Sequence, residues 1–356
     1  MRRTITTVPS MHNRLAGLNS KRAFALIGGL VLLAAILAGY CVYWRYVARQ
    51  LETGVATWAE QQRALGNEIA FEWSGIGGFP FRFAATFRQP SIRWRMPDAE
   101  IAWNGADLDA EMAPWNLHEI QLRSDGPHGA TIRLPGDPSE WHVSTTGLAG
   151  TIGLYGGGAL RGLTLALRQP DLSLPNGTAL ASAGATIMLE IPETPPTDFQ
   201  MPLARVAVDL QRIAMPPGTR LLNEDPVEAM TIDAIVKGPV PLAPPKNALT
   251  AWRDTGGVVE LSSFVFAQGP LSLTGNATVA LDPDLQPEGA GTITTVGLGD
   301  AVEILIRDGL IPPDRALVIR ATVKALEKPG PDGRPQAKLG LSLQNRTISF
   351  GPAPLF

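Results

Sequence analysis

The chain has 356 residues, and 45% of them are apolar, so it is long and apolar enough to build a sizeable core. Its 37 glycines and 31 prolines separate many short segments, which is typical of strands and turns rather than of a helical bundle. The part from residue 45 onward carries 33 acidic and 25 basic side chains, and this excess of negative charge argues against a nucleic-acid-binding surface.

Residues 23–44 contain no charged side chain. As a helix rising about 1.5 Å per residue, they match a hydrocarbon core of roughly 30 Å and predict a single transmembrane helix. The preceding residues 1–22 hold five basic and no acidic side chains, which places this tail in the cytoplasm of a bacterium by the positive-inside tendency. Everything after the helix is then expected in the periplasm, on the outer side of the inner membrane.

Aromatic side chains gather at the outer end of this segment, where rings with a polar tip suit the lipid headgroups. We expect membrane-interface anchors at Tyr40, Tyr43, Trp44 and Tyr46. A cleaved signal peptide is the competing interpretation, but its apolar region is usually shorter and ends in small residues. A lipoprotein site at Cys41 is disfavoured by the bulky Tyr40 before it. Since Cys41 is the only cysteine, no disulfide can form within the chain.

A juxtamembrane helix is predicted over residues 45–66, because Val47, Leu51, Val55 and Trp58 recur at a helical interval and Gly66 is a natural stop. It can extend the membrane helix outward before the chain turns.

The remaining residues, 67–356, are predicted to form a β-rich domain. Alternation of Phe79, Phe81, Phe83, Ala85 and Phe87 with other residues indicates one strand, and the alternation in residues 91–96 indicates an adjoining one. The phrase Arg-Gln-Pro ends the first of these segments and returns 80 residues later, at 168–170, so we interpret it as a turn that starts a strand.

Further strands are predicted wherever short alternations recur, namely at Ile120 and Leu122, Ile132 and Leu134, Leu163–Leu167, Val206–Leu210, Met230–Val236, Leu271 and Leu273, Val279 and Leu281, and Leu339–Leu343. Two helices are expected between them, at Lys246–Arg253 and Leu298–Ile311. A division into two halves is predicted near the proline-rich residues 191–202. The predicted class is mainly β with a few helices (α+β), as a large curved antiparallel sheet forming a groove or half-barrel behind the transmembrane helix.

No motif for catalysis, metal or cofactor is found. None of the four histidines lies at ligand spacing from another histidine or a cysteine, and no nucleophile elbow, phosphate loop or zinc-protease motif occurs. We therefore expect no cofactor and no enzymatic activity. The aromatic set Phe79, Phe81, Phe83 and Phe87 is the candidate face of an apolar groove. The alternative is an ordinary packed sheet face buried under the predicted helix at Val302–Leu310.

Several phrases carry a resemblance to a known family: GFPFRF at 78–83, WAEQQRALG at 58–66, APWN at 113–116, GPHGATIRLP at 126–135 and the closing LSLQNRTISFGPAPL at 341–355. With them the chain resembles the Domain of Unknown Function 2125 family of bacterial envelope proteins. More distantly it is similar to AsmA-like proteins, which join an N-terminal anchor to a β-rich outer part. That group is associated with lipid movement or envelope upkeep through an apolar β groove, and neither family brings catalytic residues.

The expected function is therefore to bind or handle a lipid or an envelope component in an apolar β groove, without catalysis. The alternative is a periplasmic scaffold that binds another envelope protein through a strand edge. The expected partners are the lipid bilayer, a lipid ligand or another envelope protein, and no nucleic acid.

Overall fold

The computed structural model describes residues 20–96, 99–133, 140–174, 177–214, 222, 226–240, 248–331, 333–344, 347–350 and 353–354. Residues 1–19 of the predicted cytoplasmic tail lie outside this description. The chain divides into two compact units, Met1–Gly54 and Val55–Phe356.

Helix α1 (Ser20–Ala64) is continuous through the predicted transmembrane and juxtamembrane segments. The two predicted helical segments thus form one helix, and by length and composition it could cross a membrane from Phe24 onward. It ends at Gly66, whose φ of 88° lies in the left-handed region that glycine tolerates. The Arg63 guanidinium then donates to the carbonyl oxygen of Ile69 (2.9 and 3.2 Å), which ties the last turn to the first strand.

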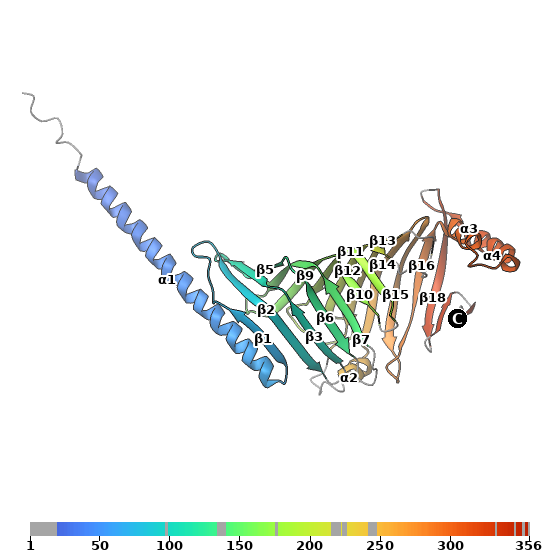
Figure 1. The fold of residues 1–356 in the computed structure, drawn as a ribbon, viewed down its shortest axis with the longest axis horizontal. Coiled ribbons are helices and arrows are strands. Elements are labelled where there is room, and N and C mark those ends of the chain that lie inside the picture. The colour runs from blue at the N-terminus through green and yellow to red at the C-terminus, as the bar shows by residue number, and fades with distance from the viewer. Residues whose placement is uncertain are drawn as a thin grey trace, which may run out of the picture. The chain divides into compact units, whose positions relative to one another are not determined.

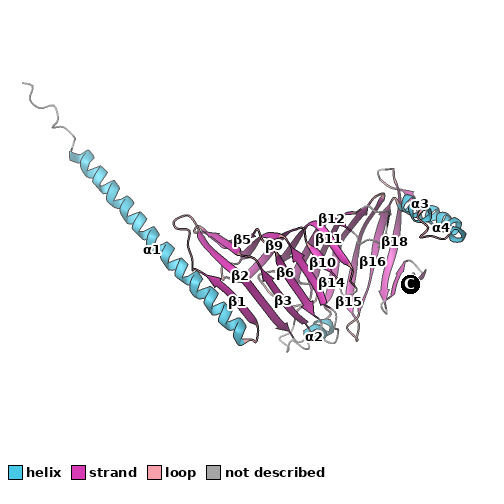
Figure 2. Ribbon diagram, viewed as in Figure 1, coloured by secondary structure: helices cyan, strands magenta, loops and turns pink. Residues whose placement is uncertain are grey.

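In its described residues the second unit contains the end of α1, one antiparallel sheet of 20 strands and three further helices. This arrangement confirms the predicted class (Figures 1 and 2). Its first half consists of β1 (Glu68–Trp73), β2 (Phe83–Met96), β3 (Ala99–Gly105), β4 (Leu108–Ala113), β5 (Asn116–Ser124), β6 (His128–Arg133), β7 (Glu140–Thr145), β8 (Gly147–Leu154), β9 (Leu160–Arg168) and β10 (Asp171–Ser173).

The second half consists of β11 (Ala179–Glu190), β12 (Pro202–Ala214), β13 (Val227–Lys237), β14 (Val258–Gln268), β15 (Leu271–Leu281), β16 (Pro287–Val296), β17 (Lys328–Pro329), β18 (Pro335–Gln344), β19 (Thr347–Phe350) and β20 (Ala353–Pro354), with helices α2 (Ala248–Asp254), α3 (Leu298–Arg307) and α4 (Pro313–Leu326). Helix α3 packs against α4 and β15. The sequence analysis missed α4.

Successive passes of the chain lie side by side, so the sheet is a meander. Each strand from β11 to β16 pairs with the next, and β16 then pairs with β18. In the first half each pass is split into two strands, and both strands pair with those of the next pass. One series of neighbours is β3, β6, β7 and β10, and the other is β4, β5, β8 and β9. Strands β2 and β11 flank these split passes. Because β11 pairs directly with β12, the sheet runs through the division predicted near 191–202.

The breaks between the split strands line up across the sheet, and we call this line the crease. It passes through Gln89, Ala106, Gly126, Thr146, Gln169, Ala183 and Arg212. Three of these residues have left-handed φ values without being glycine: Gln89 (43°), Gln169 (46°) and Arg212 (51°). Such bulges bend a strand and increase its twist, so the crease curves the sheet. The Arg-Gln-Pro phrase therefore marks a bulge inside a pass, and residues 83–96 form one strand instead of the two predicted.

Side-chain hydroxyls add hydrogen bonds to the backbone carbonyls beside the crease. Ser124 Oγ donates to the carbonyl of Asp107 (2.7 Å), and Ser182 Oγ donates to that of Gln211 (2.6 Å). Thr145 Oγ1 donates to the Arg168 carbonyl (2.6 Å) and accepts from the Gly147 amide (3.4 Å). Because unpaired buried backbone groups are costly, these hydroxyls make the bend tolerable.

Replacing Thr145 by valine keeps the shape of the side chain and removes this hydroxyl. We expect the free energy of unfolding to fall by about 0.5–1.5 kcal/mol, because the Arg168 carbonyl loses one of its hydrogen bonds while the Thr146 amide still donates to it (3.0 Å). Urea unfolding of full-length protein measures the change. Thr274→Val, on an exposed site of β15, is the control and should change stability by less than about 0.5 kcal/mol. Equal effects at the two sites would contradict the role given to Thr145.

His128 lies beside the crease at the start of β6 and is 5% exposed. Its ring stacks on Trp103 with centroids 5.6 Å apart and planes 8° apart. It lies directly over Gly105, where a Cβ atom would come within 1.8 Å of Nδ1. Neither ring nitrogen has a hydrogen-bond partner. Burial disfavours the charged imidazolium and lowers the pKa of His128 from its ordinary value near 6.5.

The folded state resists protonation of His128, whereas the unfolded chain takes up the proton near pH 6.5. The contribution of this residue is therefore complete above pH 6.5 and is lost progressively as the pH falls below it. We expect the free energy of unfolding to fall more steeply between pH 7 and pH 5 in the native protein than in His128→Phe, which keeps an aromatic ring on Trp103. Denaturant unfolding at several pH values measures both slopes, and parallel curves would contradict the assignment.

Candidate functional site

One face of the sheet is apolar across its central strands, and we call it the apolar face. The antiparallel register aligns one side chain from each strand in a row, which runs through Leu165, Ile187, Val208, Ile232 and Phe264. Adjacent rows on the same face contain Leu163, Leu189 and Val206, and Leu167, Ala185, Leu210, Met230 and Phe266. Because side chains alternate between faces, residues two apart in each strand extend this surface.

The opposite face is polar. Thr186, Asp209 and Thr231 form the row that alternates with the apolar one, and Asp209 accepts hydrogen bonds from Thr231 Oγ1 (3.0 Å) and Gln211 Nε2 (3.0 Å). Charged pairs continue this face toward β1 and β7, where Arg133 binds Glu140 at 2.6 Å. The sheet is therefore amphipathic over its whole width.

The apolar face is only half-buried. All five side chains of the Leu165 to Phe264 row keep intermediate exposure, although they lie mid-sheet. Helices α3 and α4 do not supply a second layer over this row, since their packing partners are β15 and β18. In globular domains an apolar sheet face is normally buried by another layer. An extended half-exposed apolar face therefore indicates a surface that binds something.

Helix α2 borders an apolar pocket of about 400 Å³ at one end of this face. Its wall consists of Leu203, Val236, Val240, Leu249, Trp252, Val259 and Leu281, without polar lining. Val236 and Val259 are partners in the register and continue the rows of the apolar face. The pocket is thus an extension of that face under the helix.

Trp252 fixes α2 in this position. It is 6% exposed, and its indole Nε1 donates to the Lys237 carbonyl (2.8 Å). The ring lies against the backbone of Gly257, where a Cβ atom would come within 2.2 Å of the indole. Glycine at 257 is therefore required for the wall of the pocket.

Gly257→Ala should displace the indole and weaken the packing of α2. We expect a loss of about 1–3 kcal/mol in the free energy of unfolding, the usual cost of overpacking a well-packed site. The matched control is Gly340→Ala on β18, where a Cβ atom meets nothing within 4 Å. Urea unfolding of both variants tests the assignment, which would be wrong if Gly257→Ala were as stable as the control.

The structure separates the four phenylalanines of the predicted groove face. Strand β2 begins at Phe83, so the predicted strand starts too early, and Phe79 and Phe81 lie in a turn with 51% and 73% exposure. Phe83 is 2% exposed. Phe87 is half-buried and stacks on Trp73, with centroids 5.7 Å apart. The predicted cover at Val302–Leu310 lies instead with α4 and β15, far from β2 in the strand order. A groove role for this set remains a prediction.

The four predicted interface anchors all lie on α1. Tyr43 and Tyr46 are exposed, Tyr40 is half-buried, and Trp44 is buried at 8% exposure. The rings of Tyr40 and Tyr43 are 6.2 Å apart. Exposure makes Tyr43 and Tyr46 better suited to lipid headgroups than Trp44.

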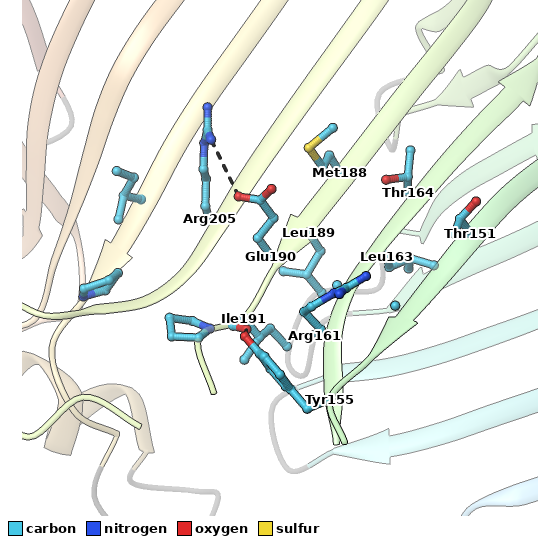
Figure 3. A pocket seen from close by; sticks show the side chains of 15 residues that line it. Thr151, Tyr155, Arg161, Leu163, Thr164, Met188, Leu189, Glu190, Ile191 and Arg205 are labelled. Carbon is cyan, nitrogen blue, oxygen red and sulfur yellow. Dashed lines mark hydrogen bonds and ion pairs between the residues drawn. The ribbon is translucent and has the colours of Figure 1, made fainter. Parts of the chain in front are cut away.

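A pocket of about 590 Å³ opens where β8, β9, β11 and β12 end (Figure 3). Its charged lining residues are Arg161, Glu190 and Arg205. Arg205 is paired with Glu190 (3.6 Å) and with both oxygens of Asp233 (2.9 and 2.6 Å). Asp233 and Glu190 raise the pKa of Arg205, and Arg205 in turn lowers the pKa of Asp233. The Tyr155 hydroxyl donates to the Ile191 carbonyl (2.9 Å). Arg205 and Tyr155 are therefore engaged in contacts that stabilise strand ends.

Within the described part of the chain, no group of three or more His, Cys, Asp or Glu side chains could hold a metal ion. The sequence analysis also found no catalytic constellation. The apolar face with its α2 pocket is therefore the candidate site.

The model of a protein family described as an uncharacterized protein conserved in bacteria (DUF2125) matches residues 44–356. The chain belongs to the DUF2125 family. This match covers the whole sheet and confirms the family resemblance of the sequence. No curated protein and no solved structure matches the chain. The more distant similarity to AsmA-like proteins remains a prediction.

Sequence reasoning missed the pocket under α2. The short helix was predicted, but the role of Trp252 depends on Gly238, directly after β13, and Gly257, directly before β14, which approach the indole only in the folded sheet. The one available signal was a tryptophan on a helix between two glycines.

Proposed function

We propose that this DUF2125 protein is anchored in the bacterial inner membrane by α1 and holds a lipid, or an acylated envelope component, on its apolar face without catalysis. The observation that carries the proposal is the half-exposed row from Leu165 to Phe264, opposite a polar face on the same sheet. An acyl chain laid on this row would remove apolar surface from water at about 25 cal/mol per Å².

The α2 pocket supports an acyl chain as the ligand. Its wall contains no polar group, so it suits the end of a hydrocarbon chain and not a headgroup. Since Val236 and Val259 belong both to the pocket and to the apolar face, one chain could occupy both.

The uncharged segment of α1 and the basic residues before it support the anchor, with the N-terminus in the cytoplasm and the sheet in the periplasm.

Val208→Asp tests the proposal at the centre of the apolar face. A carboxylate there should exclude an acyl chain, and we expect at least a roughly tenfold loss of retained lipid, since 1.4 kcal/mol of lost binding already gives that factor. The measurement is native mass spectrometry of the purified full-length protein, followed by solvent extraction and lipid analysis. Ala207→Asp, one residue away on the polar face, is the matched control.

Equal lipid retention by the two variants, both folded by circular dichroism, would contradict the proposal. A native protein that carries no lipid would favour the alternative role as a scaffold. That alternative has one supporting observation: β1 pairs only with β2 among the described strands, so its other edge is open. The exposed Glu68 and Glu72 on β1 work against strand addition there, because charges protect sheet edges.

A further inference from the structure

The GFPFRF phrase forms a turn that projects aromatic side chains out of the sheet. Gly77 pairs with Ala84 through two backbone hydrogen bonds (2.8 and 2.9 Å), and the Arg82 amide donates to the Gly78 carbonyl (3.1 Å). Gly78 has a φ of 92°, and a Cβ atom there would lie 2.6 Å from Arg82 Cγ. The turn therefore requires glycine, and it places Phe81 at 73% exposure.

A second turn lies beside it. Strand β4 returns into β5 through Pro114 and Trp115, and Trp115 is 74% exposed. The pairing of Phe83 with Met112 brings the start of β2 to the end of β4, so the two turns are neighbours. Phe81 and Met112 also line one shallow hollow of about 290 Å³. Phe81 and Trp115 thus stand on adjacent turn tips, with Phe79 on the first turn.

These rings contribute little to the fold. A fully buried large apolar side chain stabilises a protein by about 1.5–3 kcal/mol. Phe81 and Trp115 lack most of this stabilisation because they are largely exposed. Their surroundings are polar: Arg82 pairs with Glu111 at 3.0 Å, and Glu119 and Gln121 line the same hollow. Exposed phenylalanine and tryptophan beside polar groups match the headgroup zone of a bilayer, where aromatic residues concentrate.

We propose that the two turns dock the β-sheet unit on a lipid bilayer, with Phe81 and Trp115 inserted into the headgroup zone and Phe79 beside them. The proposal rests on the membrane anchor of the proposed function. Phe79 follows Trp44, at the end of the uncharged segment, by 35 residues, so anchoring keeps the bilayer surface at high effective concentration around these tips. Shallow insertion by about 5–10 Å is usual for such apolar groups.

Site-directed spin labelling of the full-length chain tests this. In a Cys41→Ser background, which removes the only cysteine, Phe81→Cys and Trp115→Cys are labelled separately. The protein is reconstituted in vesicles of phosphatidylcholine and phosphatidylglycerol. Power saturation with oxygen and with a water-soluble nickel chelate then reports the depth of each label. Ala149→Cys, exposed on the polar face, defines the value in water.

Leu317→Cys on α4 is the matched apolar control, since Leu317 is 75% exposed but lies outside the two turns. We expect labels at 81 and 115 to be at least about threefold more accessible to oxygen than to nickel, relative to Ala149→Cys, and the label at 317 to resemble water. A water-like value at either 81 or 115 would overturn the docking surface, whatever the label at 317 reports.

Flotation of the vesicles, before and after alkaline extraction, separates this proposal from the anchor. Protein that floats but is extracted by alkali would refute the anchor. In that case the double variant Phe81→Ser with Trp115→Ser decides on docking. Loss of flotation in the double variant would support docking, and unchanged flotation would overturn it. Protein that never floats would refute both ideas. Lipid retention in Val208→Asp does not depend on any of these results. The proposal that the apolar face binds lipid can therefore be refuted separately from the docking proposal.

Discussion

The register of the antiparallel meander is the constraint on which the rest of this structure depends. Side chains alternate with a period of two, and neighbouring strands keep the same phase, so Leu165, Ile187, Val208, Ile232 and Phe264 all reach one face. A slip of one residue in any strand would carry its apolar side chains to the polar face. Among the described elements none forms a second layer over this row, so each strand is stabilised mainly by its two neighbours. An amphipathic single layer retains apolar surface that a two-layer domain would bury.

The crease and the α2 segment are two solutions to the problems that such a sheet creates. A long flat sheet is unfavourable because strands twist, and aligned bulges let the first half bend along one line. The backbone groups freed by the bend are satisfied locally, as at Ser124, Thr145 and Ser182. At the other problem site, where the apolar face reaches the end of β13 and the start of β14, Trp252 closes the surface by packing on the Gly257 backbone. Both solutions depend on small or hydroxyl side chains at fixed positions in the register.

The membrane-length helix, its continuation to Gly66 and the mainly β class could all be predicted, because they follow from residue-level periodicity. The strands predicted from Leu163–Leu167 to Leu339–Leu343 lie in β9 to β18 for the same reason. The bulges at Gln89 and Gln169 could not be predicted, since a proline after a left-handed residue is as typical of a turn as of a bulge. Helix α4 was missed because the run Val318–Val323 is rich in β-branched residues, and only its contacts with α3 and β18 favour a helix.

In the GFPFRF phrase, the backbone conformation of one glycine prevents the strand that the alternating phenylalanines predict. Its alternating phenylalanines predict one strand face, but Gly78 adopts a conformation closed to other residues and directs Phe79 and Phe81 away from the strand that Phe83 begins. Phe79 and Phe81 therefore lie on the turn, whereas Phe83 and Phe87 lie on strand β2. The apolar face also has a direction, because its α2 end has no polar lining, whereas hydroxyl groups accumulate along the crease. If a lipid binds this face as proposed, its hydrocarbon end is expected at Trp252, since a headgroup there would be buried without partners.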